Sequence, residues 1–147
     1  MKNVNQLIGT WKLISFKLRL EDGIIKYPWG KNIEGQVMYG ADGYMAGSFM
    51  KQNRTLFESP DVMAAKKDEC ESAMKSYVGY AGAYSLDGMC VFHHTSVSIF
   101  PNWTGIDIKR FYEISDNKLS LSTPPLLFSG VQATAVLVWE KLPALKI

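Results

Sequence analysis

Residues 35–50 form the stretch GQVMYGADGYMAGSFM, in which two apolar runs flank the dipeptide Asp42-Gly43. An Asp-Gly pair between apolar runs is a strong signal for a tight β-hairpin, because glycine adopts positive φ without steric cost. The stretch therefore predicts two antiparallel strands, over residues 35–39 and 44–50.

The same alternation of short apolar runs and turn residues continues on both sides of this hairpin. Further turns are predicted at Glu21-Asp22-Gly23, Asp87-Gly88 and Asp116-Asn117. The runs predict strands at about residues 10–20, 35–39, 44–50, 80–85, 89–100, 106–114, 118–122 and 132–141. Consecutive hairpins favour an all-β fold, an eight-stranded antiparallel up-and-down barrel that has room for side chains or one small ligand. The length argues for one domain over residues 1–147.

One segment has a helical period instead. Cys70, Ala73, Met74, Tyr77 and Val78 recur at helical spacing and form one apolar stripe. With Ser59 as N-cap and Pro60 at the first position, the pattern predicts a helix over residues 60–78, with a break near Lys66. Such a helix either closes the barrel mouth as a lid or covers the barrel wall.

Composition and charge exclude several classes of protein. The formal net charge of +2 is too small for the broad positive field of a nucleic-acid-binding protein. Every hydrophobic run is interrupted well before the roughly 18–20 residues that a membrane span needs, and residues 1–9 contain no secretory signal. We therefore expect a cytoplasmic protein with Cys70 and Cys90 reduced; a homodimer stays open.

Several short motifs together resemble one protein family. They are Gly9-Thr10-Trp11, Tyr27-Pro28-Trp29-Gly30, Tyr80-Ala81-Gly82-Ala83-Tyr84, residues 98–105 (SIFPNWTG), residues 121–125 (LSTPP) and Val138-Trp139-Glu140. In this combination the chain resembles the lipocalin-like domain family of small, mostly uncharacterised microbial and fungal proteins. The resemblance implies a calycin-type barrel that holds small apolar molecules, with some fungal relatives associated with natural-product pathways. Unlike secreted lipocalins, the chain has no clear C-terminal Arg to pack over Trp11.

The sequence contains no familiar catalytic or metal-binding motif. His-Glu-x-x-His, Cys-x-x-Cys, Gly-x-Ser-x-Gly, the P-loop and the dinucleotide glycine fingerprint are all missing. His93 and His94 are adjacent, but successive strand residues point to opposite faces, so they do not readily share an ion. We expect no metal and no cofactor.

Alternation along two strands selects candidate inward residues. Met89, Val91, Thr95, Val97 and Ile99 share one face, which places His93 inward and His94 outward. On the next strand, Ile106, Ile108 and Ile114 place Arg110 and Tyr112 on the apolar face. A four-residue loop between the strands sets Arg110 opposite Val97 and Tyr112 opposite Thr95. A loop longer by one residue groups His94, Ser96 and Ser98 with Arg110 and Tyr112 instead, and this alternative stays open.

An inward Arg110 is the most informative residue, because a buried guanidinium needs an anion or several acceptors. It either anchors a carboxylate or phenolate headgroup, or lies at the barrel mouth with its charge in water. The candidate ligand-binding residues are His93, Arg110, Tyr112, Tyr44, Trp103 and Val97.

The expected function is binding of a small hydrophobic molecule in the barrel. The alternative is a cofactor-independent isomerase, cyclase or hydrolyase, in which His93 or Tyr112 moves a proton and Arg110 stabilises negative charge. Whether the protein is an enzyme stays open at this point.

Overall fold

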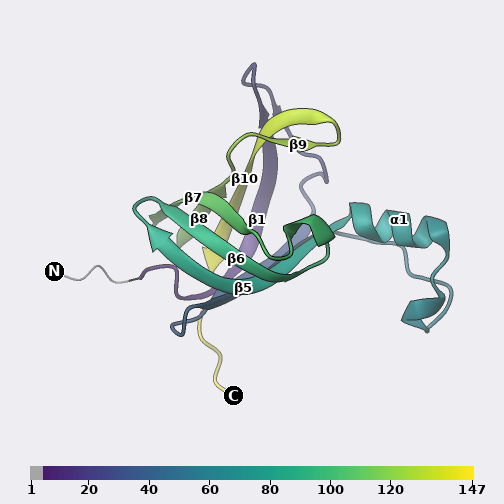
Figure 1. Ribbon diagram of the computed structural model, residues 1–147, viewed down its shortest axis with the longest axis horizontal. Helices are drawn as coiled ribbons and strands as arrows, with labels where there is room; N and C mark the ends of the chain where they lie inside the picture. Colours follow the sequence, from purple (N-terminus) through teal and green to yellow (C-terminus); the bar gives the residue numbers. More distant parts are fainter. Residues whose placement is uncertain (1–4) are drawn as a thin grey trace.

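The barrel wall is one continuous antiparallel sheet that closes on itself, as Figure 1 shows for the computed structural model. The structure describes residues 5–147, so part of the N-terminal segment tested above for a signal, residues 1–4, lies outside the described residues. The strands are β1 (Gly9–Leu20), β2 (Ile25–Lys26), β3 (Ile33–Tyr39), β4 (Tyr44–Lys51), β5 (Tyr77–Asp87), β6 (Cys90–Ser98), β7 (Asp107–Ser115), β8 (Lys118–Ser122), β9 (Leu126–Phe128) and β10 (Val131–Lys141). β1 pairs with both β3 and β10, and this second pairing closes the barrel.

The predicted eight-stranded barrel is confirmed. The barrel strands are β1, β3 to β8 and β10, and each predicted strand overlaps one of them. The short strands β2 and β9 were not predicted; they add to the sheet beside β1 and β10. The predicted hairpin at Asp42-Gly43 is present, with Gly43 at φ 90° and Tyr39 paired with Met45.

The predicted helix over residues 60–78 is too long. The segment holds a 3-10 turn, η1 (Val62–Ala64), and the helix α1 (Lys67–Lys75), separated by the extended residue Ala65. Tyr77 and Val78, counted above in the apolar stripe, belong to β5 and pair with Met50 and Phe49 in β4. Sheet pairing and burial against the barrel outweigh a local helical period here.

The start of this segment also differs from the prediction. Ser59 does not cap a helix; its hydroxyl accepts a hydrogen bond from the Asp61 backbone N–H at 3.0 Å. Asp61 caps η1 instead, accepting from the Met63 N–H at 3.0 Å. Lys66 precedes α1, where the Glu69 carboxylate accepts from the Lys66 N–H at 2.9 Å. The predicted break near Lys66 is confirmed.

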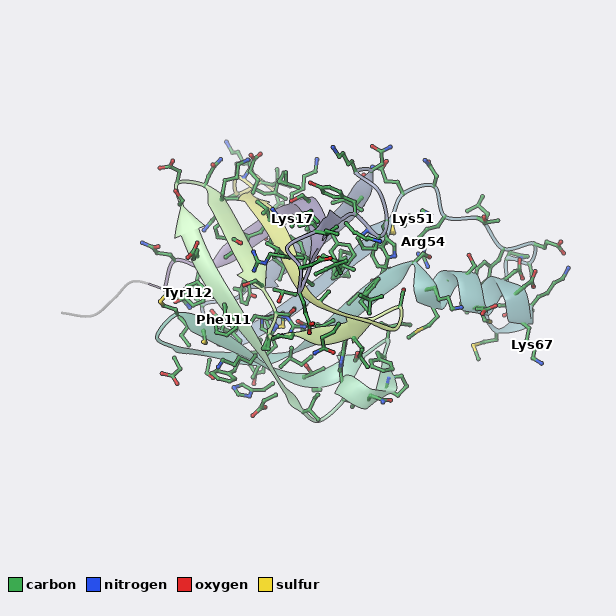
Figure 2. The ribbon with its side chains drawn as sticks, turned by 90° about the horizontal axis from the view of Figure 1, so that it is seen from above. Lys17, Lys51, Arg54, Lys67, Phe111 and Tyr112 are labelled. Atoms are coloured by element: carbon green, nitrogen blue, oxygen red, sulfur yellow. The ribbon has the colours of Figure 1, made fainter. Side chains whose placement is uncertain are left out.

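The helix α1 is neither a lid nor a cover for the wall. It projects away from the barrel (Figure 1), and none of its residues is buried. We call residues 52–76, which connect β4 to β5 and contain η1 and α1, the arm. Figure 2 places Arg54 at the root of this arm and Lys67 at its far end. Arg54 donates hydrogen bonds to the Ala73 carbonyl at 3.1 Å and the Ser76 hydroxyl at 3.0 Å, which fixes the root. No helix within residues 5–147 is long and apolar enough to cross a membrane.

Trp11 fills the end of the barrel core opposite the arm. Its side chain is 1 % exposed, and its indole N–H donates to the Leu7 carbonyl at 2.8 Å. The Lys141 ammonium lies 4.8 Å from the centre of the Trp11 ring and donates to the Ile8 carbonyl at 2.5 Å. Lys141 thus takes the place over Trp11 for which the sequence offers no Arg.

A β-bulge changes the inward face of β6. Ala81 pairs with Val97 and Gly82 pairs with Thr95, so Ser96 is an extra residue on β6. The alternation holds through Val91, His93 and Thr95, which are buried. Beyond the bulge it is reversed, and the expected inward orientation of Val97 is wrong: its side chain is 60 % exposed on the outer wall.

The predicted register between β6 and β7 is also wrong. Arg110 pairs with Val91, not Val97, and Ile108 pairs with His93. The connection between the strands is longer than four residues because it contains the 3-10 turn η2 (Pro101–Trp103). Arg110 keeps its inward face because the shift moves it by an even number of residues along the strand.

Candidate functional site

The barrel holds a cavity of about 240 Å³, lined in part by the β6–β7 and β8–β10 connections, which lie at the same end of the barrel as the β4–β5 connection that carries α1. Its wall is mainly apolar and aromatic. The lining residues are Phe16, Val37, Met45, Gly47, Ser48, Phe49, Val78, Tyr80, His93, Phe100, Trp103, Arg110, Leu121, Thr123, Leu126, Leu127, Phe128, Ala135, Leu137 and Trp139. Cavities of roughly 300–1,000 Å³ hold drug-sized ligands, so this one suits a smaller molecule.

Aromatic rings pack around the apolar part of this cavity. Phe16 contacts Phe49 and Phe128 edge to face, with ring centres 5.4 and 5.7 Å apart. Trp29 packs behind them, 5.2 Å from the Phe16 ring. These contacts prefer fixed relative orientations of the rings, and they give the apolar wall a defined shape.

The polar side of the cavity is centred on His93. Its side chain is 2 % exposed, and both ring nitrogens are hydrogen-bonded to tyrosines. The Tyr39 hydroxyl lies 2.7 Å from Nε2, and the Tyr80 hydroxyl lies 2.7 Å from Nδ1. Strands β3, β5 and β6 therefore each contribute one member to a buried chain of hydrogen bonds, which we call the Tyr39–His93–Tyr80 relay.

Burial keeps the imidazole of this relay neutral. Desolvation, followed by the nearby charges of Arg110 and His94, lowers the pKa of His93 from 6.5 to about 3. A neutral imidazole has one N–H donor and one acceptor nitrogen. One tyrosine must therefore donate to His93 and the other must accept from it.

The surroundings of the two hydroxyls decide the direction. Tyr39 does not line the cavity, and within residues 5–147 its hydroxyl has no hydrogen-bond partner other than Nε2. If it accepted from Nε2, its own proton would be buried without an acceptor, which is costly. We therefore assign Tyr39 as donor to Nε2 and the Nδ1–H as donor to Tyr80. The Tyr80 proton is then free to point into the cavity.

Arg110 supplies the positive charge at this polar side. It lies half-buried on β7, lines the cavity, and donates one hydrogen bond to the Lys109 carbonyl at 2.9 Å. Burial raises the pKa of Tyr80, and the neighbouring guanidinium of Arg110 opposes that rise. The described lining residues include no Asp or Glu, so no protein carboxylate in the cavity wall compensates the charge.

Comparison with known proteins shows the family of this chain. Residues 8–142 match the family described as the lipocalin-like domain. The chain belongs to this family. It is 30% identical over 110 residues to the 4'-hydroxy-3'-methoxypropiophenone carrier protein ppsC of Aspergillus oryzae (strain ATCC 42149 / RIB 40), an alignment that covers 69% of this chain and 99% of the relative.

Two solved structures are also similar to this lipocalin-like protein. One is a lipocalin-like protein from Bacteroides uniformis ATCC 8492, at 16% identity and a TM-score of 0.46, covering 92% of this chain and 98% of the other. The second is an uncharacterized protein from Bacteroides eggerthii DSM 20697, at 14% identity and a TM-score of 0.47, covering 93% and 100%.

Three of the six predicted site residues line the cavity of the lipocalin-like barrel. They are His93, Arg110 and Trp103. The Trp103 ring lies 5.8 Å from the Tyr80 ring and 5.2 Å from Phe100, edge to face in both contacts, so it forms part of the wall near the relay. The other three predicted residues lie elsewhere.

Tyr44, Val97 and Tyr112 do not line the cavity. Tyr44 is 64 % exposed because alternation after the hairpin turn places Met45, not Tyr44, inside. Val97 is turned outward by the β-bulge described above. Tyr112 packs against the core near the β5–β6 turn, where its hydroxyl contacts the Gly88 carbonyl at 3.4 Å, and Figure 2 shows it at the end of the barrel away from the arm.

Sequence analysis missed Tyr39 and Tyr80. Both were identifiable from alternation: Tyr39 shares a face with Val37, and Tyr80 shares one with Gly82 and Tyr84. What alternation does not give is the convergence of β3, β5 and β6 on one imidazole, which depends on the register of all three strands.

His94 lies outside the barrel, as predicted. It bridges the Ser85 hydroxyl at 2.8 Å and the Asp107 carboxylate at 2.6 Å. The connectivity is that of a catalytic triad, but Ser85 and Asp107 are exposed on the outer wall, whereas hydrolytic triads act beside an oxyanion site from which water is excluded. These bonds tie β5, β6 and β7 together. Within residues 5–147, no group of three or more His, Cys, Asp or Glu is placed to hold a metal ion.

Stability should depend on pH through His93. In the unfolded chain this imidazole takes up a proton near pH 6.5, whereas in the folded protein it stays neutral down to about pH 3. Between these values the unfolded state binds more protons, so the free energy of unfolding decreases as the pH is lowered from about 6.5 toward 3, by up to about 1.4 kcal/mol per pH unit. We expect His93→Gln, which still offers a donor and an acceptor, to lack this contribution.

Urea unfolding of both proteins at about pH 7, 6 and 5 measures the effect. Groups common to the two proteins cancel in the difference. Parallel stability profiles would show that His93 titrates alike in both states and that the burial argument is wrong.

Proposed function

We propose that this lipocalin-like protein binds a small hydrophobic molecule inside the barrel, with the polar end of the molecule at Tyr80 and Arg110. The observation that carries the proposal is the cavity of about 240 Å³, whose wall is apolar and aromatic except for one polar side. Few, localised polar groups in an apolar cavity are typical of sites that orient one small ligand. The relative from Aspergillus oryzae, named as the carrier of an aromatic ketone, supports a single-ring ligand.

The polar end of the ligand is an acidic oxygen, a carboxylate or a phenolate. Arg110 has no carboxylate partner among the described lining residues, and its guanidinium has donors beyond the one used on Lys109. An anionic oxygen in the cavity satisfies both the charge and the free donors.

Binding is favoured over catalysis by the state of the groups considered for proton transfer. Both nitrogens of His93 are occupied by tyrosines, and its pKa of about 3 makes it a weak base near neutral pH. Tyr112, the second group considered, does not line the cavity. Neither of the two groups that sequence analysis considered for proton transfer is therefore suited to act as a base at the ligand, which favours binding over the isomerase, cyclase or hydrolyase alternative.

Tryptophan fluorescence tests the proposal directly. Trp103 and Trp139 line the cavity, so 4'-hydroxy-3'-methoxypropiophenone should quench their emission saturably. Ala135 also lines the cavity, and Ala135→Phe should weaken binding by roughly tenfold or more by filling it. The matched control is Ala46→Phe, at a position that faces a hollow on the outer wall, and this variant should bind as the unchanged protein does.

Circular dichroism establishes that both variants fold. The proposal fails if no saturable quenching occurs with this ketone or with a panel of apolar single-ring probes. It fails equally if folded Ala135→Phe binds as well as Ala46→Phe.

A further inference from the structure

The polar side of the cavity offers hydrogen-bond donors and positive charge and is poor in acceptors. The titratable groups among the described lining residues are Tyr80 on β5, His93 on β6 and Arg110 on β7. Burial raises the pKa of Tyr80, so its hydroxyl stays protonated, and His93 stays neutral with both nitrogens in use. Arg110 is therefore the one charged group that the described lining presents to a ligand.

The direction of the relay makes Tyr80 a donor. The Tyr39 hydroxyl donates to Nε2 of His93, and the Nδ1–H of His93 donates to the Tyr80 oxygen. The Tyr80 hydroxyl is thus an acceptor toward His93, and its own proton is left for a ligand. Burial also raises the pKa of Tyr39, well above its ordinary value, so this first donor keeps its proton. The remaining Tyr80 O–H is held at the cavity wall beside the Arg110 guanidinium.

Resting on the proposed function and extending it, we propose that the cavity binds an acidic phenol in its ionised form. The phenolate oxygen accepts the Tyr80 hydrogen bond and faces the Arg110 guanidinium, while Tyr39 and His93 act as positioning residues that hold Tyr80 as a donor. On binding, the phenol O–H bond breaks, its electron pair stays on the oxygen, and the proton passes to the buffer.

A phenol conjugated to a carbonyl group fits this site best. Such a phenolate spreads its charge into the ring and the carbonyl, so it loses less hydration on entering an apolar cavity than a localised anion does. The aromatic wall formed by Phe16, Phe49 and Phe128 then accepts the ring and its alkyl tail. Desolvation alone would favour the neutral phenol, so ionisation depends on Arg110 and Tyr80.

Ultraviolet absorbance reports the ionisation of the bound ligand, because a phenolate absorbs at longer wavelength than its phenol. The probe is 4'-hydroxy-3'-methoxypropiophenone, added at a pH at which the free compound is mostly neutral. We expect a phenolate band that grows with protein concentration, and an apparent pKa of the bound phenol at least one unit lower than that of the free compound. One unit corresponds to a tenfold preference for the ionised form.

Variants separate the roles. Arg110→Gln should abolish the phenolate band, and Arg110→Lys should retain part of it because a charge remains. Tyr80→Phe should weaken the band by removing the donor. Tyr39→Phe should weaken it less: without the Tyr39 hydroxyl, His93 can carry its proton on Nε2, and Nδ1 can then accept the Tyr80 proton that otherwise points to the ligand. Arg54→Gln is the matched control: it removes a guanidinium at the root of the arm, outside the cavity, and should leave the band unchanged.

Two further measurements keep this inference separate from the proposed function. Calorimetry in buffers of different ionisation enthalpy should show up to one proton released for each phenol bound, and none for the 4'-methyl ether. Saturable fluorescence quenching without a phenolate band or proton release overturns the inference and leaves the binding proposal intact. An unchanged band in folded Arg110→Gln also overturns it, whereas absence of binding by both compounds and by the panel of apolar single-ring probes overturns the two proposals together.

Discussion

Gly82→Ala is expected to lower the free energy of unfolding by about 3 kcal/mol. A Cβ at this position would lie 2.0 Å from the His94 carbonyl oxygen and 3.0 Å from the Ser96 nitrogen, both backbone atoms. The two strands come this close at the β-bulge around Ser96, and glycine is the residue that allows such an approach. Because backbone cannot move aside as a side chain can, the added methyl group must push β5 and β6 apart. Equilibrium unfolding in urea measures the loss.

Gly47→Ala is the matched control for Gly82→Ala. Gly47 lies in β4 of the same barrel, and a Cβ there would meet the Val37 side chain at 3.0 Å, a contact that a small rotation relieves. We expect a cost of about 1 kcal/mol for this change. Equal losses for the two variants would mean that the bulge tolerates a side chain and that its close backbone contact does not require glycine.

The bulge also marks where sequence analysis of the site stops being reliable. Up to Thr95 the alternation on β6 correctly places His93 inside; beyond it, Ser96 inserts one residue and Val97 faces out. A local pattern of period two carries no signal for an inserted residue, because Val97 is apolar whichever face it occupies. The close approach of Gly82 to β6 is a tertiary contact that no single strand encodes.

The fold was predictable because turn chemistry is local. Asp42-Gly43 and Asp87-Gly88 specify tight turns between neighbouring strands, so the order of strands around the barrel follows from the chain order. The connection before Asp107 lacks such a turn; its η2 segment lengthened the loop and shifted Arg110 from Val97 to Val91. The predicted end of the helix was wrong for a different reason: Tyr77 and Val78 fit the apolar stripe of a helix and a half-buried strand equally well.

Within the candidate site, the types of residue were predictable and their connections were not. Arg110 and His93 were identifiable as polar residues on apolar faces. Both ring nitrogens of His93 are hydrogen-bonded, to Tyr39 and Tyr80, and these bonds depend on the relative register of three strands. This contact changes the interpretation of His93 from a group that moves protons to one that orients Tyr80.

Trp11→Ala is expected to lower the free energy of unfolding by about 3–5 kcal/mol. The indole is almost completely buried at the end of the core opposite the arm, and its removal leaves a cavity where the surrounding strands β1 and β10 are tied by pairing. The Leu7 carbonyl also loses its hydrogen bond from the indole N–H. Thermal and urea unfolding measure the loss, with Trp103→Ala, at a half-buried position in the cavity wall, as the comparison expected to cost less.

Lys141→Met separates the contribution of the Lys141 ammonium to stability from that of the buried Trp11 ring. It removes the ammonium 4.8 Å from the Trp11 ring centre and its bond to the Ile8 carbonyl but keeps an apolar side chain of similar length. Because Lys141 is exposed, we expect a cost of about 1 kcal/mol, and Lys141→Arg should restore it, since a guanidinium also stacks on an indole face. If Lys141→Met cost as much as Trp11→Ala, the charge and not the buried indole would stabilise this end of the barrel. If Lys141→Arg failed to restore stability, the contact would depend on the ammonium group and its hydrogen bond to the Ile8 carbonyl.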